Sequence, residues 1–157
     1  MEVKFTPWRF TYIVSPKPAD CIFCKAAAQH NDVLNHILHR GKTTFVILNR
    51  YPYNNGHLMV VPYRHIADLD TLTTDELSEI AEATRHAVTV LSRTMNPSGF
   101  NIGLNLGQVA GAGIADHLHV HVVPRWQGDT NFVGVIADTR LIPQSLEDTW
   151  TSLHTQW

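Results

Sequence analysis

Apolar residues in the first half of the chain follow the short runs that are typical of β-strands. Residues 36–39 and 44–48 form two such runs, and the second is rich in β-branched side chains. Residues 51–56 end in Asn-Gly, a pair that accepts the positive backbone φ of a tight turn. A third run follows at residues 58–62. The order of strand, turn and strand predicts an antiparallel hairpin.

Residues 73–95 form the one long segment with helical periodicity. Thr73 and Glu76 have the spacing of a capping box, and further acidic residues suit the positive end of a helix. One face carries a stripe at helical spacing, which consists of Leu77, Ile80, Thr84, Val88 and Leu91. Asn-Pro-Ser-Gly at residues 96–99 ends the pattern. We expect a helix whose apolar stripe packs on the sheet.

The remaining segments complete a predicted α+β fold. Residues 21–30 are rich in alanine and favour a short helix, while residues 100–106 and 118–124 indicate two further strands. A C-terminal helix is indicated by apolar side chains at helical spacing, namely Leu146, Trp150 and Leu153. The prediction is an antiparallel sheet of about five strands with helices on one face. The whole chain, residues 1–157, is expected to form one domain.

Three histidines alternate with apolar residues in His-Leu-His-Val-His, at His117, His119 and His121. Side chains on a strand point to opposite faces with a period of two, so the three imidazoles are expected on one face. Each imidazole can be a donor, an acceptor, a nucleophile or a metal ligand near neutral pH. The spacing alone fits an exposed face of hydrogen-bonded histidines, a metal site or a catalytic site.

Composition and charge narrow the function classes. The formal net charge is −2, which gives no electrostatic case for binding nucleic acid or a membrane surface. No apolar run reaches the ~18 residues of a membrane span, and the first residues lack the apolar core of a signal peptide. The expected location is therefore the cytoplasm.

The two cysteines, Cys21 and Cys24, form one Cys-x-x-Cys pair. A single pair is not the disulfide framework of a small secreted protein. Three interpretations remain open from the residues: a redox pair, two small core residues, or half of a zinc site. No thioredoxin-like pattern surrounds the pair, which counts against the redox interpretation.

The triad and its surroundings resemble the histidine triad (HIT) family, whose signature is His-φ-His-φ-His-φ-φ with φ apolar. Other blocks that resemble the family stand at residues 45–50, 55–62 and 103–107. The likeness covers about residues 20 to 132. Residues 6–9, 12–13, 124–132 and 141–144 are similar to the family's bacterial diadenosine tetraphosphate phosphorylase branch.

The resemblance implies roles for the three histidines and a homodimer. The middle residue, His119, is the expected nucleophile, because a neutral imidazole attacks a phosphoanhydride without the repulsion that an anion meets. His121 is expected to donate to phosphate oxygens. His117 either orients the row or binds zinc.

Supporting residues also follow from the resemblance. Asn49 is expected to bind ribose hydroxyls, His57 to lie beside the phosphates, and Asn105 to contact the α-phosphate or its bridging oxygen. Without the resemblance these would be read as a strand-end cap, a hydrogen-bonded histidine and a polar strand residue. Gly111 and Gly113 belong to a glycine-rich loop whose backbone N–H groups can meet phosphate oxygens, or which is a plain turn.

The same loop departs from the family pattern. Many relatives carry a Gln, Ser or Thr side chain in its last part, whereas residues 112–115 are Ala-Gly-Ile-Ala. Protonation of the leaving group therefore falls to Asp116 or to backbone groups.

The resemblance also implies a metal site. Its relatives join the cysteine pair, a histidine of a Pro-x-x-His stretch and the first triad histidine around zinc. Here the set is Cys21, Cys24, His65 and His117. Four S and N ligands close a tetrahedral site, so this zinc would be structural. No organic cofactor is expected.

Three functions are therefore considered. The first is cleavage of a dinucleoside polyphosphate, with diadenosine tetraphosphate as the expected substrate. It proceeds through a nucleotidyl-His119 intermediate, with phosphate as acceptor, giving ADP and ATP. If water replaces phosphate, the same residues make a hydrolase. The second is hydrolysis of AMP-amine conjugates, and the third is nucleotide binding with little turnover.

Overall fold

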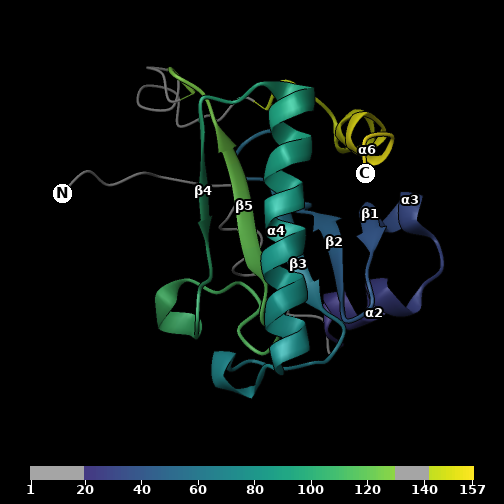
Figure 1. Cartoon of the computed structure of the whole chain (residues 1–157), viewed down its shortest axis with the longest axis vertical. Helices are drawn as coiled ribbons and strands as arrows, with labels where there is room; N and C mark the ends of the chain where they lie inside the picture. The colour runs from purple at the N-terminus through teal and green to yellow at the C-terminus, as the bar shows by residue number, and fades with distance from the viewer. Residues whose placement is uncertain (1–19, 130–141) are drawn as a thin grey trace.

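The computed structural model describes residues 20–129 and 142–157. The sheet has five strands: β1 (Ile37–Arg40), β2 (Thr44–Leu48), β3 (Leu58–Pro62), β4 (Gly99–Gly103) and β5 (Val120–Arg125). Their order is β1-β2-β3-β5-β4, and every neighbouring pair is antiparallel (Figure 1). The predicted α+β fold is confirmed. The resembling residues 6–9, 12–13, 130–132 and 141 lie outside the described residues.

The predicted antiparallel hairpin joins β2 to β3, with Leu48 opposite Leu58. Its turn depends on Gly56, which adopts φ +71°. A Cβ atom at this position would lie 2.7 Å from the Met95 sulfur. Glycine is therefore required at this turn both by backbone conformation and by space.

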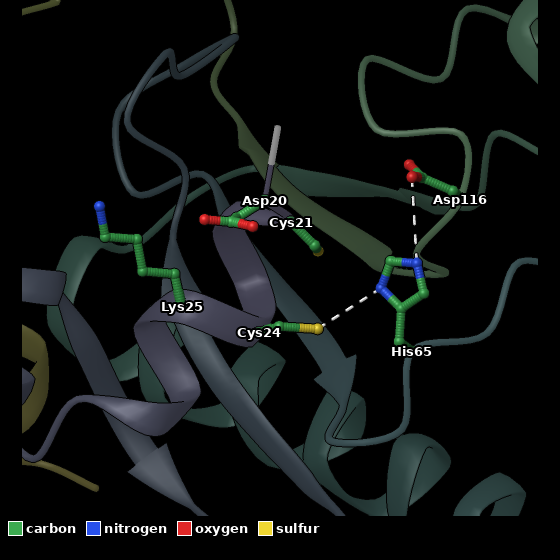
Figure 2. A pocket seen from close by; sticks show the side chains of 6 residues that line it. All are labelled: Asp20, Cys21, Cys24, Lys25, His65 and Asp116. Carbon is green, nitrogen blue, oxygen red and sulfur yellow. Dashed lines mark hydrogen bonds and ion pairs between the residues drawn. The ribbon is translucent and has the colours of Figure 1, made fainter. Parts of the chain in front are cut away.

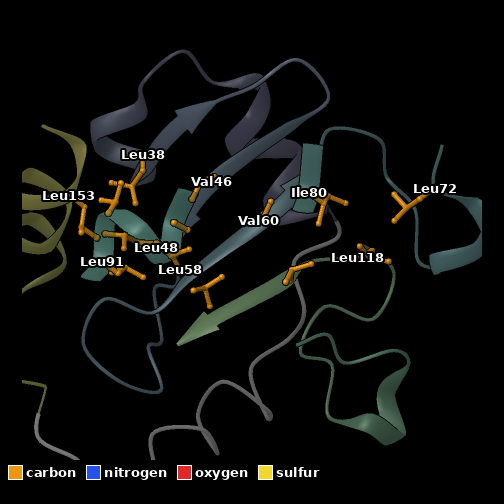
Figure 3. Packing of buried hydrophobic residues seen from close by; sticks show 14 residues of the cluster. Leu38, Val46, Leu48, Leu58, Val60, Leu72, Ile80, Leu91, Leu118 and Leu153 are labelled. Carbon is orange, nitrogen blue, oxygen red and sulfur yellow. The ribbon is translucent and has the colours of Figure 1, made fainter. Parts of the chain in front are cut away.

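Helix α4 (Thr74–Met95) crosses one face of the sheet (Figure 1). Thr73 caps it, and the capping box with Glu76 is present as predicted. The predicted apolar stripe is only partly right, because Leu77 is 46% exposed. The buried apolar side chains of α4 are Ile80, Ala87, Val90 and Leu91. Figure 3 shows this cluster with side chains from the strands and from Leu153.

The C-terminal helix α6 (Leu146–His154) confirms the predicted helix. Leu153 is fully buried, and Leu146 and Trp150 pack against the same cluster as α4. The Trp150 indole N–H donates to the Ile37 carbonyl at 2.8 Å, which attaches α6 to β1.

The opposite face of the sheet carries helix α2 (Ile22–Ala28). Its buried residues Phe23 and Ala26 pack with the strand residues of that face, which are Ile37, Phe45, Ile47, Met59 and Val61. The expectation that helices cover one face is therefore wrong. Short helices connect these parts: α3 (Asp32–Asn35), η1 (Leu69–Thr71) and η2 (Gln108–Ala110).

Two strands are shorter than predicted at the end where the histidines lie. Strand β4 ends at Gly103, which pairs with His121, and the chain then enters the loop that contains η2. Strand β5 begins at Val120, because the preceding Leu118 N–H donates to the Ile66 carbonyl, outside the sheet, at 2.7 Å. Among the described residues, no helix is both long enough and apolar enough to cross a membrane.

Candidate functional site

The three histidines share one face, although only His121 belongs to β5. The Phe23 ring of α2 lies 5.3 Å from the His117 ring and 5.1 Å from the His119 ring, centroid to centroid. Leu118 and Val120 point the other way, into the cluster under α4. The predicted alternation is therefore confirmed. The three imidazoles are buried, which contradicts the interpretation as an exposed polar face.

Hydrogen bonding fixes the tautomer of His119. Its Nδ1 lies 2.8 Å from the His117 carbonyl oxygen, which can only accept. Nδ1 therefore carries the hydrogen, and Nε2 keeps its lone pair. Burial lowers the pKa of His119, against the opposing effect of this hydrogen bond. A neutral imidazole with Nε2 unprotonated is the form that attacks an electrophile.

Two successive hydrogen bonds, through His57, fix the opposite tautomer at His121. The Tyr53 backbone N–H donates to His57 Nδ1 at 3.0 Å, so the hydrogen of neutral His57 lies on Nε2. That atom lies 2.9 Å from His121 Nδ1 and donates to it. Neutral His121 therefore carries its hydrogen on Nε2, which makes this atom a donor.

His57 stays neutral within this chain. It is only 1% exposed, and burial, with the nearby His121 and His119, lowers its pKa to about 3. The rings of His119 and His121 lie 4.7 Å apart. The structure thus sets a lone pair on one imidazole beside an N–H donor on its neighbour.

The other predicted binding residues lie at the ends of the central strands. Asn49 follows β2, and its Nδ2 atom is 3.5 Å from His57 Nε2. Asn105 is half-buried and lies two residues beyond Gly103, the partner of His121. Gly111 ends η2 with φ +88°, and Gly113 follows in the loop before the triad.

A second group of side chains lies beside the triad, where α2 meets the ends of β3 and of the triad loop (Figure 2). It consists of Cys21, Cys24, His65 and His117, whose ligand atoms all lie within 4.8 Å of one another. His117 Nδ1 is 3.2 Å from the Cys21 sulfur and 3.6 Å from the Cys24 sulfur. His65 Nδ1 is 3.4 Å from the Cys24 sulfur. We call these four residues the Cys/His cluster.

The geometry of the Cys/His cluster fits a tetrahedral metal ion. Zinc bonds of ~2.0–2.3 Å to nitrogen and sulfur place neighbouring ligand atoms about 3.6 Å apart. The His117 Nε2 atom donates to the Pro62 carbonyl at 2.9 Å, so Nδ1 turns its lone pair toward the two sulfurs. Burial and the neighbouring Cys21 raise the pKa of the Cys24 thiol, which does not favour a reactive redox pair.

One residue of the triad loop, Asp116, lies beside the Cys/His cluster. The Asp116 carboxylate lies 3.9 Å from His65 Nε2, at the Cys/His cluster, as Figure 2 shows. Protonation of the leaving group by Asp116 or by backbone groups stays a prediction. Sequence reasoning also missed Phe23 and the Tyr53 N–H, because neither carries a chemical motif.

Comparison with known proteins agrees with this geometry. The HIT domain matches residues 31–128. The AP-4-A phosphorylase of Mycobacterium tuberculosis is 44% identical over 165 aligned residues, which cover all of this chain and 85% of that protein. The asymmetrical bis(5'-nucleosyl)-tetraphosphatase of Schizosaccharomyces pombe is 32% identical over 60% of this chain and 52% of its own.

Among solved structures, a zinc-bound histidine triad family protein from Mycobacterium smegmatis has the same fold, with a TM-score of 0.69. It is 22% identical, and the match covers 87% of this chain and 91% of that one. With a domain match through the sheet and the triad, and a relative similar along its full length, the chain belongs to the histidine triad (HIT) family.

Proposed function

We propose that the chain cleaves diadenosine tetraphosphate and transfers the adenylyl group to phosphate, giving ATP and ADP. The observation that carries this proposal is the pair of opposite tautomers, with a lone pair on His119 Nε2 beside an N–H on His121. This pair combines a nucleophile with a donor for phosphate oxygens. The similarity to the mycobacterial AP-4-A phosphorylase supports the choice of substrate and acceptor.

The reaction divides into two displacements at phosphorus. His119 Nε2 attacks the α-phosphorus, the bond from that phosphorus to the bridging oxygen breaks, and ATP departs. Phosphate then attacks the same phosphorus, the P–N bond breaks, and ADP leaves while His119 regains its lone pair. The His117 carbonyl accepts the His119 Nδ1–H throughout and stabilises the positive charge on the substituted ring.

The remaining residues are assigned supporting roles. His121 Nε2–H donates to an α-phosphate oxygen, and His57 holds His121 in the tautomer that allows this. Asn49 binds ribose hydroxyls and Asn105 contacts the α-phosphate. Backbone N–H groups of the loop at Gly111 and Gly113 meet the departing phosphates.

Zinc in the Cys/His cluster is part of the proposal. Cys21, Cys24, His65 and His117 would hold one ion in a closed site, with no position left for a reacting water. When bound, the ion would attach helix α2 to the segments beside the sheet that carry His65 and His117. Each step of the chemistry belongs to the triad and its neighbours.

A homodimer is proposed at strand β4, one of the two edge strands of the described sheet. Large apolar side chains are exposed on this strand and just beyond it, at Ile102, Leu104, Leu106 and Val109. An exposed apolar sheet edge favours pairing with another chain, here a second copy. A cytoplasmic location remains an expectation from the sequence.

Product analysis tests the proposed reaction. Purified protein is given diadenosine tetraphosphate with and without phosphate, and nucleotides are separated over time. ATP and ADP in equal amounts, formed only with phosphate, support the proposal. AMP and ATP formed without phosphate would identify a hydrolase. The fission yeast relative is named as such an enzyme, an asymmetrical tetraphosphatase. Turnover of an AMP-amine conjugate alone, or binding without turnover, would contradict both.

Variants of the triad test the intermediate. His119→Ala should abolish turnover and retain nucleotide binding, whereas His121→Ala should lower the rate by about 10²–10³, the usual loss for one charge-stabilising donor. Rapid acid-free quenching should trap an adenylyl group on the wild-type protein and none on His119→Ala. A label on another residue would contradict the mechanism.

A further inference from the structure

Phe23 stands between the two cysteines of the sequence and contacts two histidines of the triad. Its side chain is 1% exposed. The ring meets His117 edge-on, at an interplanar angle of 72°, and lies tilted against His119 at 51°. One side chain of α2 therefore touches both a member of the Cys/His cluster and the proposed nucleophile.

This contact restrains the orientation of the His119 ring. The ring is held by one hydrogen bond from Nδ1 and by its neighbours, Phe23 and His121. Rotation of the imidazole about its χ2 torsion would break the bond to the His117 carbonyl and turn Nε2 away from its reactive direction. Packing against the Phe23 ring on one side and the His121 ring on another opposes that rotation, because the turning imidazole would meet these neighbours.

The two ends of α2 are fixed in different ways. At its C-terminal end, Arg40 donates to the carbonyls of Ala27 and Gln29, each at 2.8 Å. At its N-terminal end the cap residue is Cys21, whose side chain makes no capping hydrogen bond to the helix. Instead, Cys21 and Cys24 point at His117 and His65. The end of α2 that carries Phe23 is thus attached through the Cys/His cluster.

We propose that Phe23 is a positioning residue for His119, and that a metal ion in the Cys/His cluster fixes Phe23 against the nucleophile. The proposal rests on the proposed function. It gives the cluster a task beyond stability: metal binding at Cys21 and Cys24 holds the first turn of α2, and that turn holds the His119 ring in one orientation.

Phe23→Leu tests the first half, with Phe45→Leu as its matched control. Phe45 belongs to the same cluster, is fully buried and stacks on Tyr63. Both variants lose the same atoms from the same core, so both should lower Tm by a similar amount. Phe23→Leu should in addition lower kcat by tenfold or more with KM within twofold of wild type, while Phe45→Leu keeps kcat within twofold. Equal kcat values in the two variants would overturn the assignment.

Long-range ¹H–¹⁵N NMR of the histidine side chains tests both halves without using activity. His119 should show one tautomer, with hydrogen on Nδ1, in zinc-loaded wild type and in Phe45→Leu. It should show a mixture in Phe23→Leu and in wild type after zinc removal by a chelator, and zinc addition should restore the single tautomer. An unchanged His119 signal after verified zinc removal would overturn the coupling to the metal.

The two readouts separate this proposal from the proposed function. If wild type does not turn over diadenosine tetraphosphate, the proposed function fails, and the NMR spectra still decide whether Phe23 orients His119. If Phe23→Leu does not fold, Phe23→Met replaces it as the smaller change, and the chelation experiment on the wild-type protein decides by itself.

Discussion

Burial of a neutral His57 should make the folded protein sensitive to acid, and the structure gives the size of the effect. The side chain is 1% exposed, and burial lowers its pKa to about 3, with His121 and His119 contributing in the same direction. In the unfolded chain the imidazole titrates near the ordinary value of ~6.5. The unfolded state therefore binds a proton over a pH range in which the folded state does not.

The sign and magnitude follow from that difference in proton binding. His57 leaves stability unaffected above pH ~6.5, and each unit of acidification below it lowers the free energy of unfolding by up to about 1.4 kcal/mol. The loss ends at the folded-state pKa of about 3. Between pH 7 and pH 5 the contribution is therefore about 2 kcal/mol, a large part of the 5–15 kcal/mol that is usual for a domain.

Urea unfolding at pH 7 and pH 5, at one protein concentration, measures this contribution. His57→Gln removes the titrating group and keeps a side-chain N–H that can donate to His121. Its free energy of unfolding should fall by about 2 kcal/mol less than that of wild type between the two pH values. Leu58→Val is the control, since it loses about 1 kcal/mol from a buried neighbour at either pH. Equal pH dependence in wild type and His57→Gln would refute the reasoning.

Three further predictions concern the metal site, the hairpin turn and the sheet edge. Elemental analysis should find about one zinc per chain in protein purified without chelator and none in Cys21→Ser/Cys24→Ser; unchanged zinc content would refute the Cys/His cluster as its site. Gly56→Ala should lower the free energy of unfolding by about 1–3 kcal/mol, because the residue must adopt φ +71°, and urea unfolding measures the loss. Ile102→Lys should shift a dimer toward monomer in sedimentation equilibrium, and an unchanged mass would contradict pairing at β4.

The elements that short sequence motifs determine were predicted correctly. The hairpin from β2 to β3 follows from two β-branched runs around Asn-Gly, and the start of α4 follows from its capping box. The inward face of α4 was harder to predict, because Glu76 occupies a buried position. It is 4% exposed and pairs with Arg64 at 2.7 Å, so the next residue, Leu77, turns outward. A hydrophobic pattern does not count a buried carboxylate, paired here with a half-exposed Arg64, as part of the core.

The sequence also contained a signal for helices on both faces of the sheet, and the prediction of helices on one face did not use it. Every residue of β2 and of β3 is buried, which requires cover on both faces of the sheet. A continuous apolar run such as Phe-Val-Ile-Leu in β2 already indicates this arrangement. Placing α2 on the second face explains how the cysteine pair reaches the histidines.

At the site, the spacing predicted which histidines share a face, and the four cluster residues converge as expected. Spacing contains no information on tautomers. Those of His119 and His121 depend on two main-chain groups, the His117 carbonyl and the Tyr53 N–H, which nearly any residue type would supply, proline at position 53 excepted. Such partners are set by backbone geometry, so only a structure reveals them.

The two roles expected for His117 use different atoms and do not compete. Its ring points Nδ1 at the cysteine sulfurs and donates from Nε2 to Pro62, whereas its main-chain carbonyl accepts from His119. Any substitution removes the ring and leaves the carbonyl in the chain. If a His117 variant loses activity, the reason would be that its backbone carbonyl has moved away from His119 once the ring no longer holds it in place. Such a loss would not identify His117 as an acid or a base in the reaction, because both ring nitrogens are already engaged away from His119.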